Sequence, residues 1–467
     1  MGWNQSFTIK SIGFVFIVLL ALHFSFPGKL YGLEWLMAAF IIFTFVFLGI
    51  QSFNNRWENI TEKSFITRLF WFSFGFRVAA MLLLLLISYS TWDMFYYVGA
   101  KDEMKYFRVA SEASDVFSMF GLSEAYKHIL ENYRNEISDT GFCAFQTVLI
   151  IIIGSSPIIF KLIYITIGSF TVIRLYKLTT LVFDQRVARL SAIIFMLFPI
   201  AWFYSIVLMK ESLMILLILE AIIQILKLQK QLNLNTLLKL LLLVVLLFFF
   251  RSAISILMVL VAAFSMFLLT KKNRLLVNIV VTIVLLGAYL YFLQSTGKAD
   301  DYYEQYTETD EFESRRVETG TKINPYFAVA NAPVYVSISL FAPFPSFVKV
   351  PIDSGLPHNE YYYHIAGCLT WIILAFFSIV GLYHAIRYRR QELAPIWAFI
   401  LGYQFILLKA ILFTSVRFSY PAKPLLIIMA AYGIYKLKNK YIFNLYLGAA
   451  LLMIIGWNYV RLTGRGG

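Results

Sequence analysis

Two adjacent carboxylates stand out in the stretch KDEMKYFRVA, residues 101–110, which follows a run of about twenty apolar residues. Asp102 and Glu103 are followed by Tyr106, about one helical turn further along. A carboxylate in such a place can take a proton from a reacting hydroxyl. The alternative interpretation is a solvated helix start with acids in its first turn.

Further charged residues interrupt sequence that is otherwise apolar. Lys210 and Glu211 lie in a short turn between two apolar runs, Arg251 ends another run, and Lys409 and Arg417 flank a later one. Charge at membrane depth is unfavourable by about 2.5–3.5 kcal/mol per residue at a helix centre, so such residues are functional candidates. Two structural alternatives stay open. The arginines could extend to lipid phosphates, and Lys210 and Glu211 could pair with each other.

Taken together, these residues suggest one site. We expect Lys210, Arg251 and Arg417 to converge on one cavity beside the carboxylates, because all of them fall at the same predicted depth. Such a cavity would hold an anion next to an acid. Transfer from a lipid phosphate needs both, with cations to neutralise the departing phosphate and a carboxylate to accept the proton.

A second polar group follows an aromatic, proline-containing stretch at residues 325–364. It contains His358, Glu360 and His364. Imidazole and carboxylate are metal ligands, but this spacing fits no helical ligand motif. We favour a wall that faces sugar or lipid, with His358 and Glu360 as substrate-binding residues. A divalent cation is the one cofactor that stays open.

The elements that position these residues are membrane helices. Hydrophobic residues make up 60% of the 467 residues and charged residues 14%, which is outside the range of soluble globular chains. The sequence predicts an all-α polytopic membrane protein with about 13 transmembrane helices, at about 20 apolar residues each. The expected spans are 11–26, 33–51, 69–90, 145–177, 188–208, 212–227, 237–250, 253–270, 275–293, 365–386, 395–413, 421–436 and 441–459.

Two of these segments have special features. The span at 145–177 is too long for one straight helix and contains Gly154, Ser155, Ser156 and Pro157, so we expect a broken helix or two short ones. The first apolar segment has no small-residue cleavage site after it and is expected to be retained. Cys143 and Cys368 lie at the edges of apolar segments, and we expect no disulfide between them.

Lys and Arg in the short loops predict the orientation. One set of loops is basic, and we place it in the cytoplasm: Arg56, Lys63, Arg68, Arg174, Lys177, Arg186, Arg189, Lys227, Lys230, Lys239, Lys271, Lys272, Arg274, Arg387, Arg389, Arg390, Lys436, Lys438 and Lys440. The alternate set contains two long loops, 91–141 and 294–364, which hold more acids than bases and are expected outside. The net charge of +14 is therefore a topology signal and not a nucleic-acid footprint.

The first outer loop contains an amphipathic segment. Tyr126, Ile129, Leu130, Tyr133 and Ile137 fall on one helical face. This helix is expected to lie along the outer membrane surface and to roof a cavity. The sequence has no phosphate-binding glycine loop, no dinucleotide fingerprint and no nucleophile elbow, which argues against an ATP-driven pump.

The order of these features resembles the GT-C superfamily of integral-membrane glycosyltransferases, such as protein O-mannosyltransferases and the bacterial aminoarabinose transferases of lipid A. Those enzymes carry an acidic pair and an aromatic residue in the first large outer loop, and KDEMKYFRVA looks like that segment. The stretches IGSFTVIRLYKLTTLVFDQRVARLSAIIFMLFPIAWFYSIVLMKESLMILL and VRFSYPAKPLLIIMAAYGIY are similar to later helices of the family. The resemblance covers residues 69–436.

The resemblance implies an inverting transfer of a sugar from a polyprenyl-phosphate-linked donor, on the outer face of a bacterial inner membrane. It implies a loop carboxylate as the general base, with Asp102 as first choice and Glu103 as second. The acceptor is a glycan, a lipid or a protein, and membrane lipids are the other expected partners. Two alternatives stay open: a polymerase of surface-polysaccharide repeat units that uses lipid-diphosphate-linked oligosaccharides, and a non-enzymatic flippase for lipid-linked sugars.

The expected organisation has four parts. Residues 1–68 form two N-terminal transmembrane helices, and residues 69–293 form the GT-C-like module with its outer loop at 91–141. Residues 294–364 form the second outer loop, and residues 365–467 the C-terminal helices.

Overall fold

A computed structural model describes most of the chain. The described residues are 3–93, 101–133, 137, 140–231, 233–268, 287, 339–348, 361–389, 391–409 and 416–463. The helices of the first half are α1 (Gln5–Ser25), α2 (Leu33–Arg56), α3 (Glu62–Trp92), α4 (Lys101–Phe120), α5 (Leu122–Asn132), α6 (Thr140–Ile153), α7 (Pro157–Val182), α8 (Gln185–Leu197), α9 (Pro199–Ile206), α10 (Glu211–Lys230), α11 (Leu234–Phe250) and α12 (Ser252–Leu268). The later ones are α18 (Tyr361–Tyr388), α19 (Ala394–Lys409), α20 (Val416–Ser419), the 3-10 turn η3 (Tyr420–Ala422), α21 (Lys423–Lys436) and α22 (Lys440–Thr463).

The described residues form no β-strand, only an isolated bridge between Leu30 and Val348. Within them, six helices are long and apolar enough to cross a membrane: α1, α2, the residues Glu62–Ser90 of α3, α7, His364–Tyr388 of α18, and Tyr441–Val460 of α22. This confirms an all-helical polytopic membrane protein. The count of thirteen spans stays a prediction, and the expected span 275–293 lies almost entirely outside the described residues.

Two of the expected spans are broken at proline. The break expected near Gly154 is confirmed, because α6 ends at Ile153 and α7 begins at Pro157. Gly154 has a φ of +83°, a backbone conformation that side chains other than glycine rarely adopt. The segment 188–208, expected as one helix, is bent by 56° between α8 and α9. Pro199 explains this bend, since it begins α9 and cannot donate to the preceding turn.

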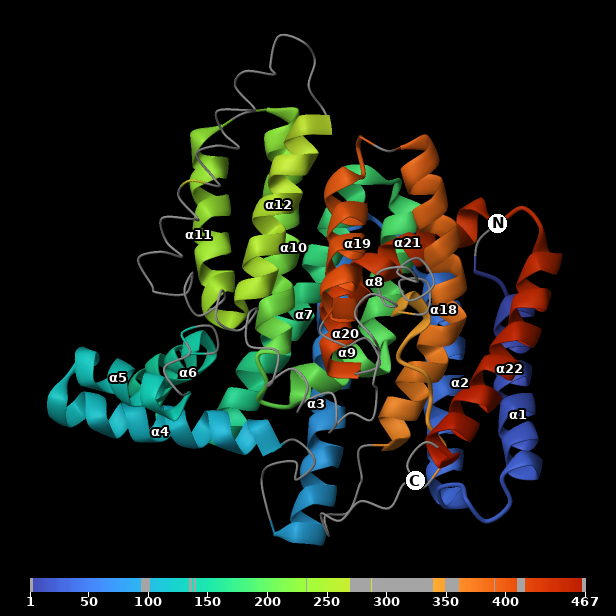
Figure 1. Ribbon diagram of the computed structural model, residues 1–467, viewed down its shortest axis with the longest axis horizontal. Coiled ribbons are helices and arrows are strands. Elements are labelled where there is room, and N and C mark those ends of the chain that lie inside the picture. The colour runs from blue at the N-terminus through green and yellow to red at the C-terminus, as the bar shows by residue number, and fades with distance from the viewer. Residues whose placement is uncertain are drawn as a thin grey trace.

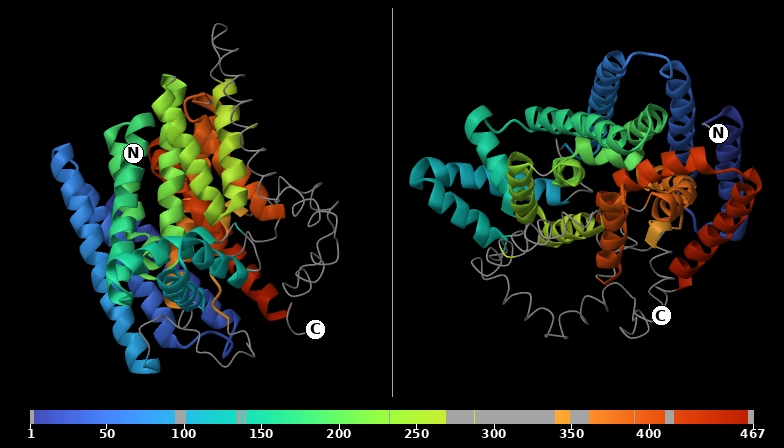
Figure 2. Two further views of the ribbon diagram at one scale, coloured as in Figure 1. Left: turned by 90° about the vertical axis from the view of Figure 1, so that its left-hand side faces the viewer. Right: turned by 90° about the horizontal axis from the view of Figure 1, so that it is seen from above.

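Most helices run roughly parallel to one another, whereas α4 and α5 lie across one end of the bundle and project beyond its side (Figure 1). The views from the side and from above show the same projection (Figure 2). The expected amphipathic helix of the outer loop is therefore α5, shorter than predicted, with Tyr133 as its C-cap. Ala125 and Ile129 are its buried residues. Whether this end faces outward, and the domain boundaries, remain predictions.

The tightest helix contact joins α18 and α21, and glycine makes it possible. A methyl group on Gly381 would lie 1.9 Å from the carbonyl oxygen of Met429, and one on Gly433 would lie 2.0 Å from that of Phe377. The two backbones therefore touch directly, as small residues allow in membrane helix pairs. Because α21 continues η3 and α20, this contact also positions the chain around Arg417.

Candidate active site

Arg417 lies at the centre of a polar cluster at the end of the bundle that α4 crosses. It belongs to the short helix α20, and its guanidinium donates from Nη1 to Asp102 and from Nε to Glu211. Its third nitrogen, Nη2, lies 3.4 Å from the hydroxyl oxygen of Tyr106. One planar fork thus joins the first turn of α4, the first turn of α10 and a segment more than 200 residues further along the chain.

The two carboxylates of this cluster differ in exposure. The side chain of Asp102 is 45% exposed and that of Arg417 22%, whereas Glu211 is buried. The second oxygen of Glu211, Oε2, is buried without a hydrogen-bond partner in the described part of the chain. Burial lowers the pKa of Arg417, but Glu211, Tyr106 and Asp102 raise it, so its pKa lies above the ordinary value and the group stays charged. Asp102 is therefore the accessible acid, and Glu211 Oε2 can still accept a hydrogen bond.

Glu103, the neighbour of Asp102, has a different environment. It is fully buried, accepts from Lys161 of α7, and also accepts from the backbone N–H of Leu208 at 3.2 Å. Lys161 Nζ lies 3.5 Å from the carbonyl oxygen of Ile206. The alternative interpretation, in which both acids are exposed to solvent at the start of a helix, is thus wrong for Glu103. A buried carboxylate paired in this way fixes the start of α4 against the end of α9.

Lys210 and Arg251 lie next to this cluster. Lys210 precedes Glu211 and donates to the carbonyl oxygen of Phe250 at 3.2 Å. Arg251 follows Phe250, and its guanidinium lies 4.8 Å from the ring centre of Phe418, the residue after Arg417. Arg251 and Lys210 therefore both contact neighbouring protein groups at this end of the bundle.

A further arginine, Arg77, lies behind the cluster. It is fully buried in α3 and donates from Nε to the Ser205 hydroxyl at 2.8 Å and from Nη1 to the Ser73 hydroxyl. Ser205 belongs to α9, whose Tyr204 stacks on Tyr420 at 5.0 Å between ring centres. Tyr420 lies near both Arg77 and Glu211. A buried arginine at this position adds positive potential to the site.

Sequence reasoning missed Arg77 and Lys161. Both interrupt apolar runs, FWFSFGFRVAAMLLLLLI and PIIFKLIYITIG. The rule that selected Lys210 and Arg251, that charge at membrane depth marks a functional candidate, would have selected these two as well.

Three other predicted residues are not brought to the cluster by the described structure. His358 and Glu360 lie outside the described residues, and Lys409 is the last residue of α19, with its side chain not described. His364 begins the membrane segment of α18, and its ring meets Phe203 edge-on at 6.1 Å. The described residues contain no group of three His, Cys, Asp or Glu side chains placed to hold a metal ion.

Comparisons with known proteins show a likeness to solved structures. No family model and no curated protein matches the chain. Among solved structures, the chain is similar to the archaeal oligosaccharyltransferase AglB from Archaeoglobus fulgidus, solved in complex with an inhibitory peptide and a dolichol-phosphate. The sequences are 16% identical, the TM-score is 0.43, and the match covers 84% of this chain and 56% of that one. A likeness this distant assigns no activity.

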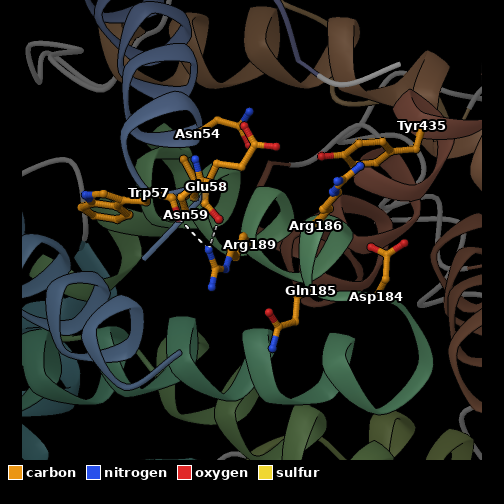
Figure 3. Close-up of a pocket in the computed structure, with 10 residues that line it drawn as sticks. Asn54, Trp57, Glu58, Asn59, Asp184, Gln185, Arg186, Arg189 and Tyr435 are labelled. Atoms are coloured by element: carbon orange, nitrogen blue, oxygen red, sulfur yellow. Dashed lines mark hydrogen bonds between the residues drawn. The ribbon is translucent and has the colours of Figure 1, made fainter. Parts of the chain in front are cut away.

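A polar pocket of about 420 Å³ lies at the opposite end of the bundle, where α2 ends and α8 begins (Figure 3). Arg189 is buried at its edge and donates to the carbonyl oxygens of Trp57, at 2.7 Å, and of Glu58. These bonds provide donors for backbone carbonyl oxygens just after the C-terminal end of α2, which have no partner within the helix. The pocket also contains Arg186, Glu58 and Asp184, so its charges balance. We therefore place no anion site there.

Proposed function

We propose that the chain is a membrane glycosyltransferase that moves a sugar from a polyprenyl-phosphate-linked donor to an acceptor hydroxyl at the Arg417 cluster. The observation that carries this proposal is the guanidinium of Arg417 between Asp102 and Glu211 at one end of the bundle. A cation that can bind phosphate and a carboxylate that can take a proton lie in direct contact. The resemblance of KDEMKYFRVA to the acidic segment of GT-C enzymes points to the same reaction.

The charge of the region favours a bound anion. Five cations gather around the site: Arg77, Lys161, Lys210, Arg251 and Arg417. Among the described residues, three carboxylates accompany them, those of Asp102, Glu103 and Glu211. The excess of positive charge matches a lipid phosphate, whose negative charge grows as the bond to the sugar breaks.

In the proposed step, the acceptor oxygen attacks the anomeric carbon from the face opposite the phosphate. The carbon–oxygen bond to phosphate breaks, and its electron pair leaves with the lipid phosphate. The hydroxyl proton passes to Asp102, which is the exposed carboxylate of the cluster. A single displacement inverts the anomeric configuration. Glu211 Oε2 accepts a hydrogen bond from a sugar hydroxyl, since no described residue donates to this carboxylate oxygen.

Arg417 has two roles in this scheme. In the structure it forms an ion pair with the Asp102 carboxylate. A donor phosphate competes for the same fork and draws it away from Asp102. Binding of the donor thereby releases the base at the moment when it is needed. Glu103, the second choice for the general base, is buried against Lys161. We therefore assign it a positioning role and not that of the base.

Lipids that co-purify with the protein provide the first test. Mass spectrometry should find a polyprenyl monophosphate, free or carrying one sugar. In proteoliposomes, that sugar should move to an acceptor with inverted anomeric configuration, detected by NMR of the product. A diphosphate carrier with an oligosaccharide would point to the repeat-unit polymerase. Movement of the intact lipid-linked sugar across the bilayer without transfer would point to the flippase.

A further inference from the structure

A short segment from the aromatic, proline-containing stretch is inserted among the helices. We call residues 339–348 the inner arm. Its residues Leu340, Ala342, Phe347 and Val348 are buried. Most of the inner arm has no regular secondary structure, so its buried backbone groups need hydrogen-bond partners from other elements.

Side chains of the last membrane helices supply these partners. Each of the following donates to a carbonyl oxygen of the inner arm: Trp371 of α18 to Leu340 at 3.1 Å, Lys423 of α21 to Ala342 at 2.7 Å, and Asn458 of α22 to Pro345 at 3.1 Å. The inner arm is thus attached to α18, α21 and α22 at successive points. Its position and that of these helices depend on each other.

Lys423 has the most constrained position of the three donors. It is fully buried, and its Nζ lies 3.6 Å from the ring centre of Trp371 as well as 2.7 Å from the carbonyl oxygen of Ala342. Among the described residues, no carboxylate forms an ion pair with it. A buried cation is unfavourable unless its surroundings stabilise it, so the ring face and the carbonyl oxygen determine where this ammonium lies.

A short stretch of chain joins Lys423 to the Arg417 cluster. Lys423 begins α21, and Arg417 lies six residues before it, on the other side of η3. Six residues of helix span about 9 Å. The carbonyl oxygen of Phe418 accepts from the hydroxyl of Tyr403 at 2.8 Å, which holds this stretch against α19. Lys423 holds its C-terminal end against the inner arm.

We propose that Lys423 is a positioning residue, which fixes Arg417 between its two acids by anchoring the stretch 416–422 to the inner arm. The inference rests on the proposed function, because it concerns the geometry of the proposed transfer. Lys423 is enclosed by protein and touches no substrate. The guanidinium has to meet Asp102 and Glu211 together, and a displacement of about 1 Å caused by a remote change can lower a rate by about 10²-fold.

Hydrogen–deuterium exchange of the full chain in detergent tests the anchor without any substrate. Lys423→Met keeps a long side chain but removes the donor to Ala342. Exchange should become at least about tenfold faster in residues 339–348 and 416–422, because both stretches lose a shared attachment and open locally. Ser378→Ala is the matched control, since the Ser378 hydroxyl contacts the carbonyl oxygen of Leu426 between the same two helices, at 2.8 Å. It should leave both stretches unchanged.

A double-mutant cycle tests whether Lys423 acts through Arg417. In the transfer assay, Lys423→Met should lower kcat by about 10²-fold and change the KM for the donor much less. In the Arg417→Lys background the same substitution should have an effect of less than about threefold, because the fork that Lys423 positions is already lost. Two effects that simply multiply would indicate a general loss of structure and would overturn the proposal.

The two measurements separate this inference from the proposed function. If the unmodified protein transfers no sugar, the proposed function fails, and the exchange measurement alone decides about the anchor. Unchanged exchange of residues 416–422 in Lys423→Met, or an equal change in Ser378→Ala, would overturn it. If Lys423→Met does not fold, Lys423→Gln takes its place with the same expected signs, since its shorter side chain cannot keep both contacts of the ammonium.

Discussion

Arg417 lies 315 positions after Asp102 in the sequence, yet its Nη1 donates directly to the Asp102 carboxylate. The contact closes the cluster, since the same guanidinium also holds Glu211. A fork with three engaged nitrogens fixes the distance between a helix that lies across the bundle and two helices within it. The predictions below separate the chemical role of each partner from its structural role.

The Asp102→Asn variant should lose activity. The amide keeps the shape of the carboxylate but cannot accept the proton, so turnover should fall by about 10²–10⁴-fold, the usual contribution of a positioned base. Binding of the donor lipid should change little. A transfer assay and a lipid-binding assay measure the two effects. Asp115→Asn, in an exposed position of the same helix, is the control. Near-normal turnover of Asp102→Asn would remove Asp102 as the base.

The Arg417→Lys variant should also impair transfer, although the charge is kept. An ammonium group cannot reproduce the planar fork, which holds Asp102 and Glu211 together and, in the proposed step, keeps Glu211 while it takes the phosphate in place of Asp102. We expect turnover to fall by about 10²-fold, as for loss of one donor to a developing negative charge. Arg108→Lys, an exposed arginine on α4, should be neutral. Equal activity of the two variants would show that only charge matters at position 417.

The pair of Glu103 and Lys161 should matter for stability more than for chemistry. Lys161→Met leaves the buried Glu103 carboxylate without its cation and should destabilise the protein by about 3–5 kcal/mol. The double variant Glu103→Gln with Lys161→Met should recover much of that loss. Thermal unfolding in detergent measures both. Removing the exposed pair of Arg108 and Glu112 should change stability by about 0–1 kcal/mol. A double variant as unstable as the single one would mean that the pair has no coupled role.

Labelling with a membrane-impermeant maleimide tests the orientation. Cysteine at position 115, in α4, or at position 310, in the second long loop, should react in intact cells. Cysteine at position 438, between α21 and α22, should react only after the membrane is permeabilised. The native Cys143 and Cys368 are both buried, so their background should be low. Protection of position 115 together with labelling of position 438 in intact cells would invert the topology.

The sequence predicted those parts of the fold that are determined by residues at the same position in the chain. Glycine and proline marked the break at residues 154–157, because one permits a positive φ and the other cannot continue the preceding turn. The bend at Pro199 had the same signal, but the apolar run through it favoured a single span. The amphipathic pattern indicated α5 but not its end, since Ile137 continues the pattern beyond the helix.

The contacts within the Arg417 cluster are not determined by residues near one another in the sequence. Adjacent acids in the sequence gave no indication that Glu103 is buried against Lys161 while Asp102 remains exposed, because burial depends on which helix packs beside α4. Arg417 was selected from its depth, and its partners depend on the packing of α20, α10 and α4 together. Pairing between such distant segments is a property of tertiary structure.

The direct contact of Gly381 with Gly433 makes the accuracy of the site depend on a remote point. Arg417 precedes Gly433 by 16 residues on a nearly continuous helical path, a separation of about 24 Å. If a side chain at position 433 pushed α21 along α18, the guanidinium would move by the same amount, away from both acids. Gly433 therefore determines the position of Arg417 along the bundle. Its replacement would impair activity like a change in the active site, although Gly433 lies at the other end of the helix.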